Sequence, residues 1–116
     1  MAFTEKEIAE HTITLEKHFW STIRPPVNLR PLIREGQRFS ASAIELFFVR
    51  PRFNRPGQTV EESIAKIRYV RRTNVWLIFW QRADLKWHSY PLQPEAESLV
   101  AALKIIKKDS NNCFFG

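Results

Sequence analysis

Basic and aromatic side chains alternate along one stretch of the chain, residues 66–91 (KIRYVRRTNVWLIFWQRADLKWHSYP). The stretch holds three of the four tryptophans, both tyrosines and six Arg or Lys. A sheet face with this composition can bind single-stranded nucleic acid, because bases stack on exposed aromatic rings while cationic side chains contact phosphates. The candidate stacking residues are Phe79, His88 and Tyr90, and the candidate phosphate contacts are Lys66, Arg68, Arg72 and Lys86.

Two other arrangements would explain the same basic and aromatic face. A helix could cover it, or two copies of the chain could bury it together as a homodimer, with the Lys and Arg stems lying around an apolar patch. The sequence has no aromatic-Gly-aromatic sheet signature, no Gly-x-x-Gly loop and no zinc knuckle. Because the chain is basic, we nevertheless expect a non-enzymatic binding module with nucleic acid as the favoured partner. A homodimeric protein-interaction domain is the alternative.

A third interpretation is a metal-dependent nuclease, in which carboxylates hold a divalent ion and a lysine stabilises developing charge. The residues of the required types are Glu45, Glu61, Glu62 and Asp84, with Lys66 or Lys86. Asp84 falls in an expected turn, where Asp is a common turn residue for conformational reasons alone. This interpretation is the least favoured of the three, and the sequence assigns no catalytic residue, metal ligand or cofactor.

The remaining reactive side chains favour structural roles. Cys113 is the only cysteine, which excludes an internal disulfide and is typical of a reducing, cytoplasmic compartment. We expect it to pack as a small hydrophobe. His11 and His18 are seven residues apart and can share a helix face, but two histidines without a third ligand are a weak indication of a metal site.

The positive charge is concentrated in the middle of the chain. The net charge of the 116 residues is +6, and residues 24–86 hold thirteen Arg or Lys against five Asp or Glu. Such a skew favours polyanionic partners, nucleic acid above all, although a solvated basic surface without a dedicated partner explains it equally simply. No apolar run approaches the roughly 20 residues of a membrane span, and the N-terminal residues do not resemble a secretory signal.

Helical patterns flank the central stretch. The first predicted helix runs from Thr4, which forms a capping box with Glu7, to Ile23. Its expected buried stripe is Ile8, Leu15, Phe19 and Ile23, widened by Ile13 and Trp20. The second predicted helix runs from Pro94 to Lys108, with Ala96, Leu99, Val100, Leu103 and Ile106 as its stripe.

Five strands are expected between these helices. The first two are residues 27–39, which reach a turn near 35–37, and residues 43–49. A flexible loop with three arginines follows at 50–58, and residues 60–63 lead back into the sheet. The last three strands lie within 66–90, with turns at 73–74 and 82–85. We therefore predict an α+β fold in which an antiparallel meander of about five strands is packed against the N-terminal and C-terminal helices.

The faces of the last three strands follow from parity if both turns contain an even number of residues. One face then holds Ile67, Tyr69, Trp76, Ile78, Trp80 and Trp87, which we expect to be the core face. The other holds Lys66, Arg68, Val70, Arg72, Leu77, Phe79, Lys86, His88 and Tyr90. A turn with an odd number of residues would shift the register and exchange the faces of the strand that follows it.

Three segments carry a family resemblance: Val75-Trp76, residues 80–90 (WQRADLKWHSY) and the ending Cys113-Phe114-Phe115-Gly116. Together they resemble the short bacterial proteins grouped as domain of unknown function 3024, and the likeness extends over essentially the whole chain. It implies a bacterial origin and one self-contained domain over residues 1–116, and no activity. Residues 39–43 depart from the family pattern, since the turn there reads as longer. We expect the apolar ending to dock on the domain.

Overall fold

The structure is a computed structural model and describes residues 2–109 and 113–114. The N-terminal helix consists of α1 (Glu5–Leu15), a π-helical turn (Glu16–Trp20) and α2 (Ser21–Ile23). The backbone amide of Thr4 donates to Glu7 Oε1 at 2.9 Å, and the amide of Glu7 donates to Thr4 Oγ1 at 3.1 Å. The predicted helix and its capping box are confirmed, but Ile13 is 68% exposed and is not part of the buried stripe.

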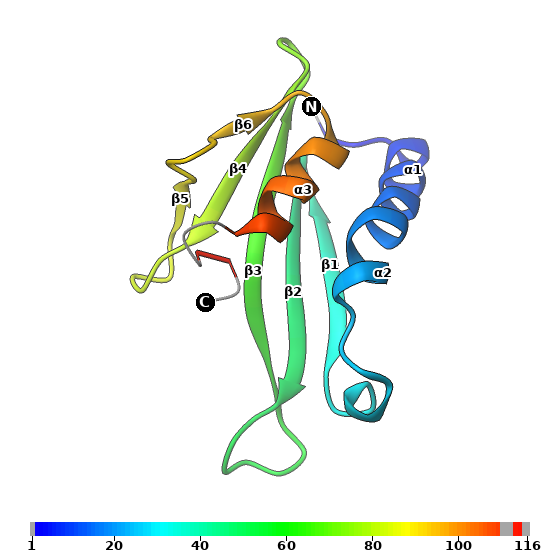
Figure 1. Ribbon diagram of the computed structural model, residues 1–116, viewed down its shortest axis with the longest axis vertical. Helices are drawn as coiled ribbons and strands as arrows, with labels where there is room; N and C mark the ends of the chain where they lie inside the picture. Colours follow the sequence, from blue (N-terminus) through cyan, green and yellow to red (C-terminus); the bar gives the residue numbers. More distant parts are fainter. Residues whose placement is uncertain (1, 110–112, 115–116) are drawn as a thin grey trace.

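The strands form an antiparallel sheet in the order of the sequence (Figure 1). They are β1 (Arg34–Ser40), β2 (Ala43–Pro51), β3 (Thr59–Val70), β4 (Val75–Gln81), β5 (Trp87–Ser89) and β6 (Glu95–Ala96), and α3 (Leu99–Lys108) follows. Both β5 and β6 pair with the same edge of β4, so they are two parts of an interrupted fifth strand. The predicted α+β fold and five-stranded meander are confirmed.

The first hairpin differs from the prediction in three ways. The strand β1 begins at Arg34 rather than at residue 27. Residues 27–29 form a 3₁₀ turn instead, and Pro31 lies between this turn and the strand. Gly36 lies inside β1 opposite Phe47 rather than in a turn. The connection to β2 is a tight two-residue turn, with Ala41 in the left-handed region at φ 52°, so this turn is not lengthened.

Two further boundaries are corrected. Residues 59–70 form one continuous strand, in which a bulge near Ile64 shifts the pairing with β2. The last helix begins at Leu99 rather than Pro94, because the Ser98 hydroxyl accepts from the amide of Ala101 at 3.1 Å and caps the helix there. The residues before Ser98 pair with β4 as β6 instead of joining the helix.

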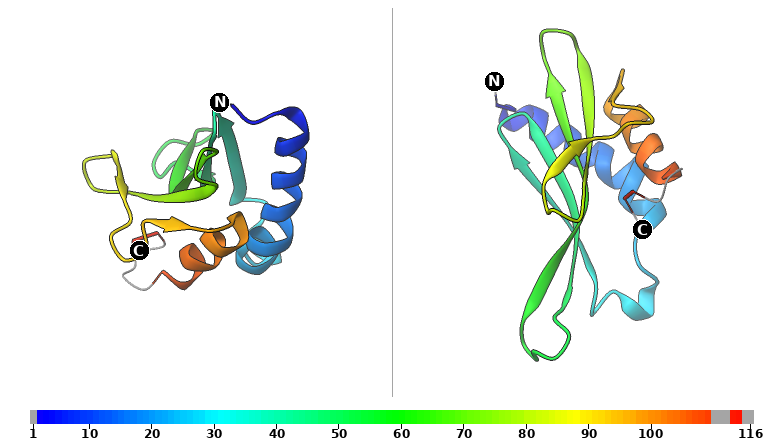
Figure 2. Two further views of the ribbon diagram at one scale, coloured as in Figure 1. Left: turned by 90° about the horizontal axis from the view of Figure 1, so that it is seen from above. Right: turned by 90° about the vertical axis from the view of Figure 1, so that its left-hand side faces the viewer.

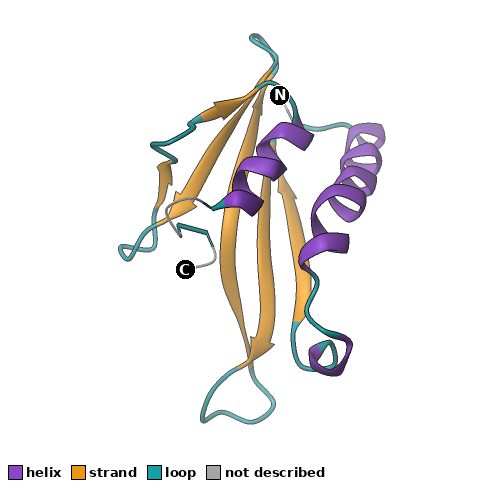
Figure 3. Cartoon of the chain, viewed as in Figure 1, coloured by secondary structure: helices purple, strands orange, loops and turns teal. Residues whose placement is uncertain are grey.

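Both helices pack on one face of the sheet, as the views along and across it show (Figure 2). The buried core joins Ile44, Leu46, Ile67 and Ile78 of the sheet to Leu15, Phe19, Leu99, Leu103 and Ile106 of the helices. The other face of the sheet has no helix against it in the described part of the chain; we call it the open face (Figure 3).

The described part of the C-terminal segment docks on the core, as predicted. Phe114 is buried, and its ring centroid lies 4.8 Å from that of Tyr90. Its backbone amide donates to Asp109 Oδ1 at 3.0 Å, while Asp109 ends α3 in the left-handed region at φ 43°. Phe115 and Gly116, which also belong to the predicted ending, lie outside the described residues.

Candidate nucleic-acid interface

The central strands place basic and aromatic side chains in register on the open face. Lys66 of β3 pairs with Phe79 of β4, and Arg68 pairs with Leu77. Residues paired across an antiparallel ladder share a face, so these four side chains lie on the same side. The turn between β3 and β4 spans residues 71–74, an even number. The predicted division of faces is therefore confirmed for β3 and β4.

The turn between β4 and β5 is odd, and the faces of β5 are the reverse of those predicted. Trp87 pairs with Gln81 and His88 pairs with Trp80, which leaves the five residues 82–86 between the strands. Leu85 adopts the left-handed region at φ 64°, and its amide donates to the Arg82 carbonyl at 2.8 Å. This is a three-residue hairpin turn closed by a bulge, in which a glycine is usual at the left-handed position.

Trp87 consequently joins the open face. Together with Lys66, Arg68 and Phe79 it lines a small pocket of about 130 Å³, and we call these four residues the open-face patch. The Arg68 guanidinium lies 5.9 Å from the centre of the Phe79 ring. Arg68 is exposed, while the other three side chains are half-buried. The prediction of Trp87 as a core residue is wrong, and the sequence analysis missed it as a site residue.

The cations of the patch lack an acidic partner in the described part of the chain, where no carboxylate oxygen lies within 4 Å of Lys66 or Arg68. Glu45 is the cross-strand neighbour of Lys66, but its carboxylate binds Arg38 at 3.0 Å. Arg38 also binds Glu61 at 2.7 Å. Among the described residues, the ammonium and guanidinium groups of the patch therefore have no carboxylate that competes with an external anion.

The other predicted binding residues do not join the patch. Arg72 is exposed in the β3–β4 turn, and Lys86 is exposed in the β4–β5 turn. His88 faces the side of Trp80, and its Nε2 lies 2.8 Å from Asp84 Oδ2. Tyr90 is only 2% exposed, so its ring is not available for stacking on a ligand. The prediction that His88 and Tyr90 lie on the basic face is wrong, because the odd turn moves the residues after it to the opposite side.

The carboxylates proposed for a nuclease are each bound to another group. Arg38 forms ion pairs with Glu45 and Glu61, and Glu62 pairs with Arg50. Asp84 accepts from the Lys86 amide at 2.9 Å, and this bond, with the contact to His88, lowers the pKa of the Asp84 carboxyl. In residues 2–109 and 113–114 no three His, Cys, Asp or Glu side chains are grouped as a metal would require. Among the described residues, these carboxylates therefore do not form the common metal site that a metal-dependent nuclease would need.

His11 and Cys113 have packing roles in the structure. The His11 ring packs edge-to-face on Trp76 at 5.2 Å, and burial lowers the pKa of its imidazole. Cys113 lies against the core, where burial raises the pKa of its thiol and disfavours the reactive thiolate. His18 lies in the π-helical turn and is half-buried.

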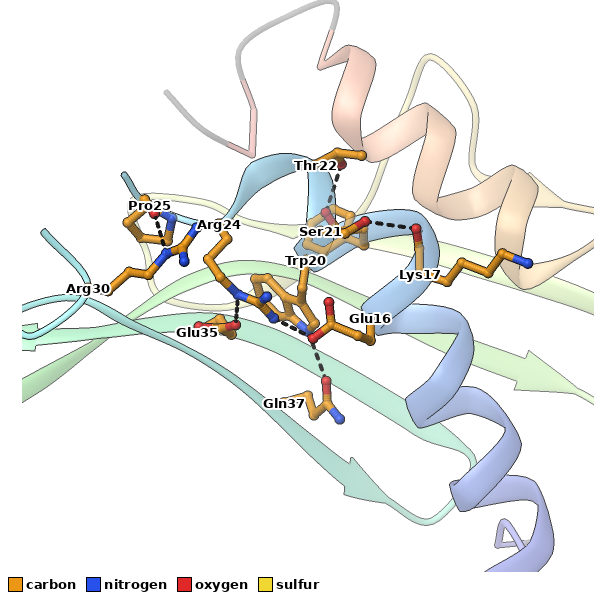
Figure 4. A network of polar contacts seen from close by, with 11 residues as sticks. Glu16, Lys17, Trp20, Ser21, Thr22, Arg24, Pro25, Arg30, Glu35 and Gln37 are labelled. Carbon is orange, nitrogen blue, oxygen red and sulfur yellow. Dashed lines mark hydrogen bonds and ion pairs between the residues drawn. The ribbon is translucent and has the colours of Figure 1, made fainter. Parts of the chain in front are cut away.

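A polar network fixes the N-terminal helix to the sheet edge at β1 (Figure 4). Arg24 forms ion pairs with Glu16 and Glu35. The Trp20 indole donates to Gln37 Oε1 at 2.8 Å. Since Trp20 belongs to the π-helical turn, this turn aims its ring at β1. The network holds the helix on the core side, and so helps to leave the open face uncovered.

Comparisons with known proteins place the whole chain in one family. A family model described as Domain of unknown function (DUF3024) matches residues 3–116. No curated protein and no solved structure matches the chain. No helix in the described residues is long and apolar enough to cross a membrane. The resemblance noted in the sequence is thereby confirmed at the level of the family.

Proposed function

Because the chain belongs to the DUF3024 family, whose description assigns no activity, we propose its function from the open face: the protein binds single-stranded nucleic acid on the open-face patch. The observation that supports this most strongly is the pocket in which Lys66 and Arg68, without a carboxylate within 4 Å among the described residues, lie beside Phe79 and Trp87. Aromatic surface for stacking and cations for phosphates are the two components that sheet platforms for single strands require.

The shape of the patch suits a strand better than a duplex. Its two aromatic side chains come from adjacent strands, β4 and β5, and line one small pocket of about 130 Å³. An unstacked base can lie against an aromatic ring at such a surface, while the bases of a duplex are already stacked on one another. Arg68 is well placed for a phosphate contact, since its guanidinium is exposed beside the Phe79 ring.

Self-association through the open face is the competing proposal, and the charges of the patch oppose it. In a two-fold dimer the same surface meets itself, so both copies of Lys66 and Arg68 would be buried together. Glu45, the cross-strand neighbour of Lys66, is already bound to Arg38, as is Glu61. Such an interface would desolvate four cations without partners, whereas a phosphate backbone supplies the missing negative charge.

The proposal is tested by titrating a labelled 16-nucleotide single strand with the wild type, Trp87→Leu and Trp87→Phe. Loss of one stacked base costs about 1–3 kcal/mol, so Trp87→Leu should weaken binding roughly 5- to 140-fold. Trp87→Phe keeps an aromatic ring and should retain most of the affinity. Equal affinity of wild type and Trp87→Leu would refute stacking on this residue.

The mass of the protein, measured in the same buffer, separates the two proposals. A monomer that binds the strand supports the platform. The opposite result is a dimer that does not bind the strand and becomes monomeric when Trp87 is replaced by Leu. It would show that the open face serves self-association instead of nucleic-acid binding.

A further inference from the structure

The hairpin between β2 and β3 extends beyond the rest of the sheet at one end of the molecule (Figure 1). Residues 50–60 form its end, and we call them the arm. Every one of them is exposed. The pairing of β1 with β2 ends at Arg34 and Val49, and the pairing of β4 with β3 ends at Phe79 and Lys66, so neither neighbouring strand reaches the arm.

The loop at the end of the arm is ordered by its own backbone. The amide of Arg52 donates to the Gln58 carbonyl at 2.9 Å, and the amides of Arg55 and Gln58 close two successive turns. Asn54 and Gly57 take the left-handed conformations that these turns need, at φ 66° and 83°. These turns set the positions from which the side chains of the arm project. The flexibility expected from the sequence stays a prediction.

The side chains of this loop have the composition of the open-face patch. Arg52 and Arg55 have no carboxylate within 4 Å in the described residues, while Arg50 is paired with Glu62. Phe53 is 89% exposed, the most exposed large hydrophobic side chain described. The loop thus combines an exposed aromatic ring with two arginines that have no acidic partner among the described residues, as the open-face patch combines two cations with two aromatic rings.

We propose that the arm is a second contact for the same nucleic-acid strand, so that the protein binds through two separated sites; this rests on the proposed function of the open-face patch. Arg52 and Arg55 would contact phosphates, and Phe53 would stack on a base. Between the two sites, the charges of Arg34 and Arg38 on the open face equal those of Glu45 and Glu61 in number. The surface between the sites thus carries no net negative charge from these four residues.

The length of β3 sets the expected footprint. Lys66 and Thr59 lie seven residues apart on the strand, which at ~3.3 Å per residue is roughly 23 Å. A stacked strand advances ~3.4 Å per nucleotide, so about seven stacked nucleotides would join the two sites, and fewer when the strand is unstacked and extended. An oligonucleotide of three nucleotides is too short to span this distance even when extended, while one of 16 can occupy both.

The experiment compares wild type with Arg52→Gln/Arg55→Gln on single strands of three and 16 nucleotides over a range of salt. Lys104→Gln/Lys108→Gln, on the exposed side of α3, removes the same charge elsewhere and is the matched control. For the 16-mer, the log–log salt slope of the arm variant should be less steep by about 1.4, at ~0.7 per lost phosphate contact. For the 3-mer, affinity should change by about twofold at most, since the open-face patch remains.

The stacking contact has its own variant. Phe53→Leu should weaken binding of the 16-mer roughly 5- to 140-fold, because one stacked base is lost. Every arm variant should keep the wild-type melting temperature, because residues 50–60 are exposed and make no part of the core.

Three results would overturn the arm proposal in distinguishable ways. If the arm variants bind the 16-mer like the wild type while Trp87→Leu weakens it, the second contact is refuted and the open-face patch stands. If wild type binds neither oligonucleotide, the proposed function fails and this inference fails with it. If the arm variants lose binding to phosphatidylserine vesicles but not to the 16-mer, the arm is a membrane-surface element instead.

Discussion

Gly36 allows the Phe47 ring to approach the backbone of β1 closely on the open face, and Gly36→Ala should destabilise the protein. A Cβ atom at this position would lie 2.3 Å from Cε2 of Phe47 and 2.8 Å from its Cζ. The Phe47 ring is 9% exposed and lies under Arg38, whose guanidinium is 4.9 Å from the ring centre. The ring must therefore shift, and it must displace Arg38 from its place above it.

The cost of this overpacking can be estimated. Forcing one extra carbon into a packed site typically costs about 1–3 kcal/mol. A chain of 116 residues unfolds with an entropy of roughly 0.24 kcal/mol/K at ~2.1 cal/mol/K per residue. The melting temperature of Gly36→Ala should therefore be lower than that of the wild type by about 4–12 °C.

A double-mutant cycle with Phe47→Leu isolates the clash, with thermal and urea unfolding as the assays. Leu at position 47 removes the ring atoms that the new Cβ would meet, so Gly36→Ala should cost at least about 1 kcal/mol less in that background. Ser40→Ala, an exposed position of the same strand, should stay within about 0.5 kcal/mol of wild type. If Gly36→Ala costs the same in both backgrounds, to within ~0.5 kcal/mol, the contact with Phe47 is not the cause.

Two predictions concern the helices. Hydrogen bonding to Arg71 lowers the pKa of Glu7 from 4.5 to about 2, so its stabilising effect is complete above pH 4.5 and is lost as the pH falls towards 2. The melting temperature of Glu7→Gln should therefore fall less than that of wild type over this range, and an equal fall would contradict the ion pair. Ile106→Ala, at a fully buried position, should lower the free energy of unfolding in urea by about 2–5 kcal/mol. Ile13→Ala, at a 68% exposed position, should lower it by less than ~0.5 kcal/mol, and equal losses for the two variants would contradict this assignment of the core.

The sequence predicts the fold well where local chemistry agrees with the tertiary structure. The Thr4 capping box and the alternation along β3 and β4 are local patterns, and the even turn after Val70 preserves the register between these strands. Asn74 takes the left-handed conformation that closes this turn, and Asn is one of the residues that tolerate it. Both the helix and the central face division follow from such signals.

The error in the site has one physical source, Leu85. A three-residue hairpin turn with a bulge needs a left-handed residue, which Gly or Asn would indicate, and here it is a leucine at φ 64°. The odd turn exchanges Trp87 with His88 between the faces. The polar contacts that stabilise the turn, from the Lys86 amide to Asp84 and from the Gln81 amide group to the Leu85 carbonyl, become apparent only in three dimensions.

The error at the second helix has a different origin. Pro94, Glu95 and Glu97 are all favourable in a first helical turn, so they indicate an earlier start. The free edge of β4 competes for the same residues: the Ile78 amide donates to the Pro94 carbonyl at 2.9 Å, and Ala96 pairs with Trp76. Pairing with the sheet outweighs local helix preference, and Ser98 then becomes the cap.

The most direct test of the open-face patch is the salt dependence of single-strand binding for Lys66→Gln/Arg68→Gln, measured beside Lys104→Gln/Lys108→Gln. Both double variants lose the same charge, but only the first pair lies on the open face. The account predicts a log–log slope less steep than wild type by about 1.4 for the open-face variant and an unchanged slope for the helix variant. Equal slopes for the two variants would show that binding follows net charge alone, and would contradict the open-face patch as the binding site.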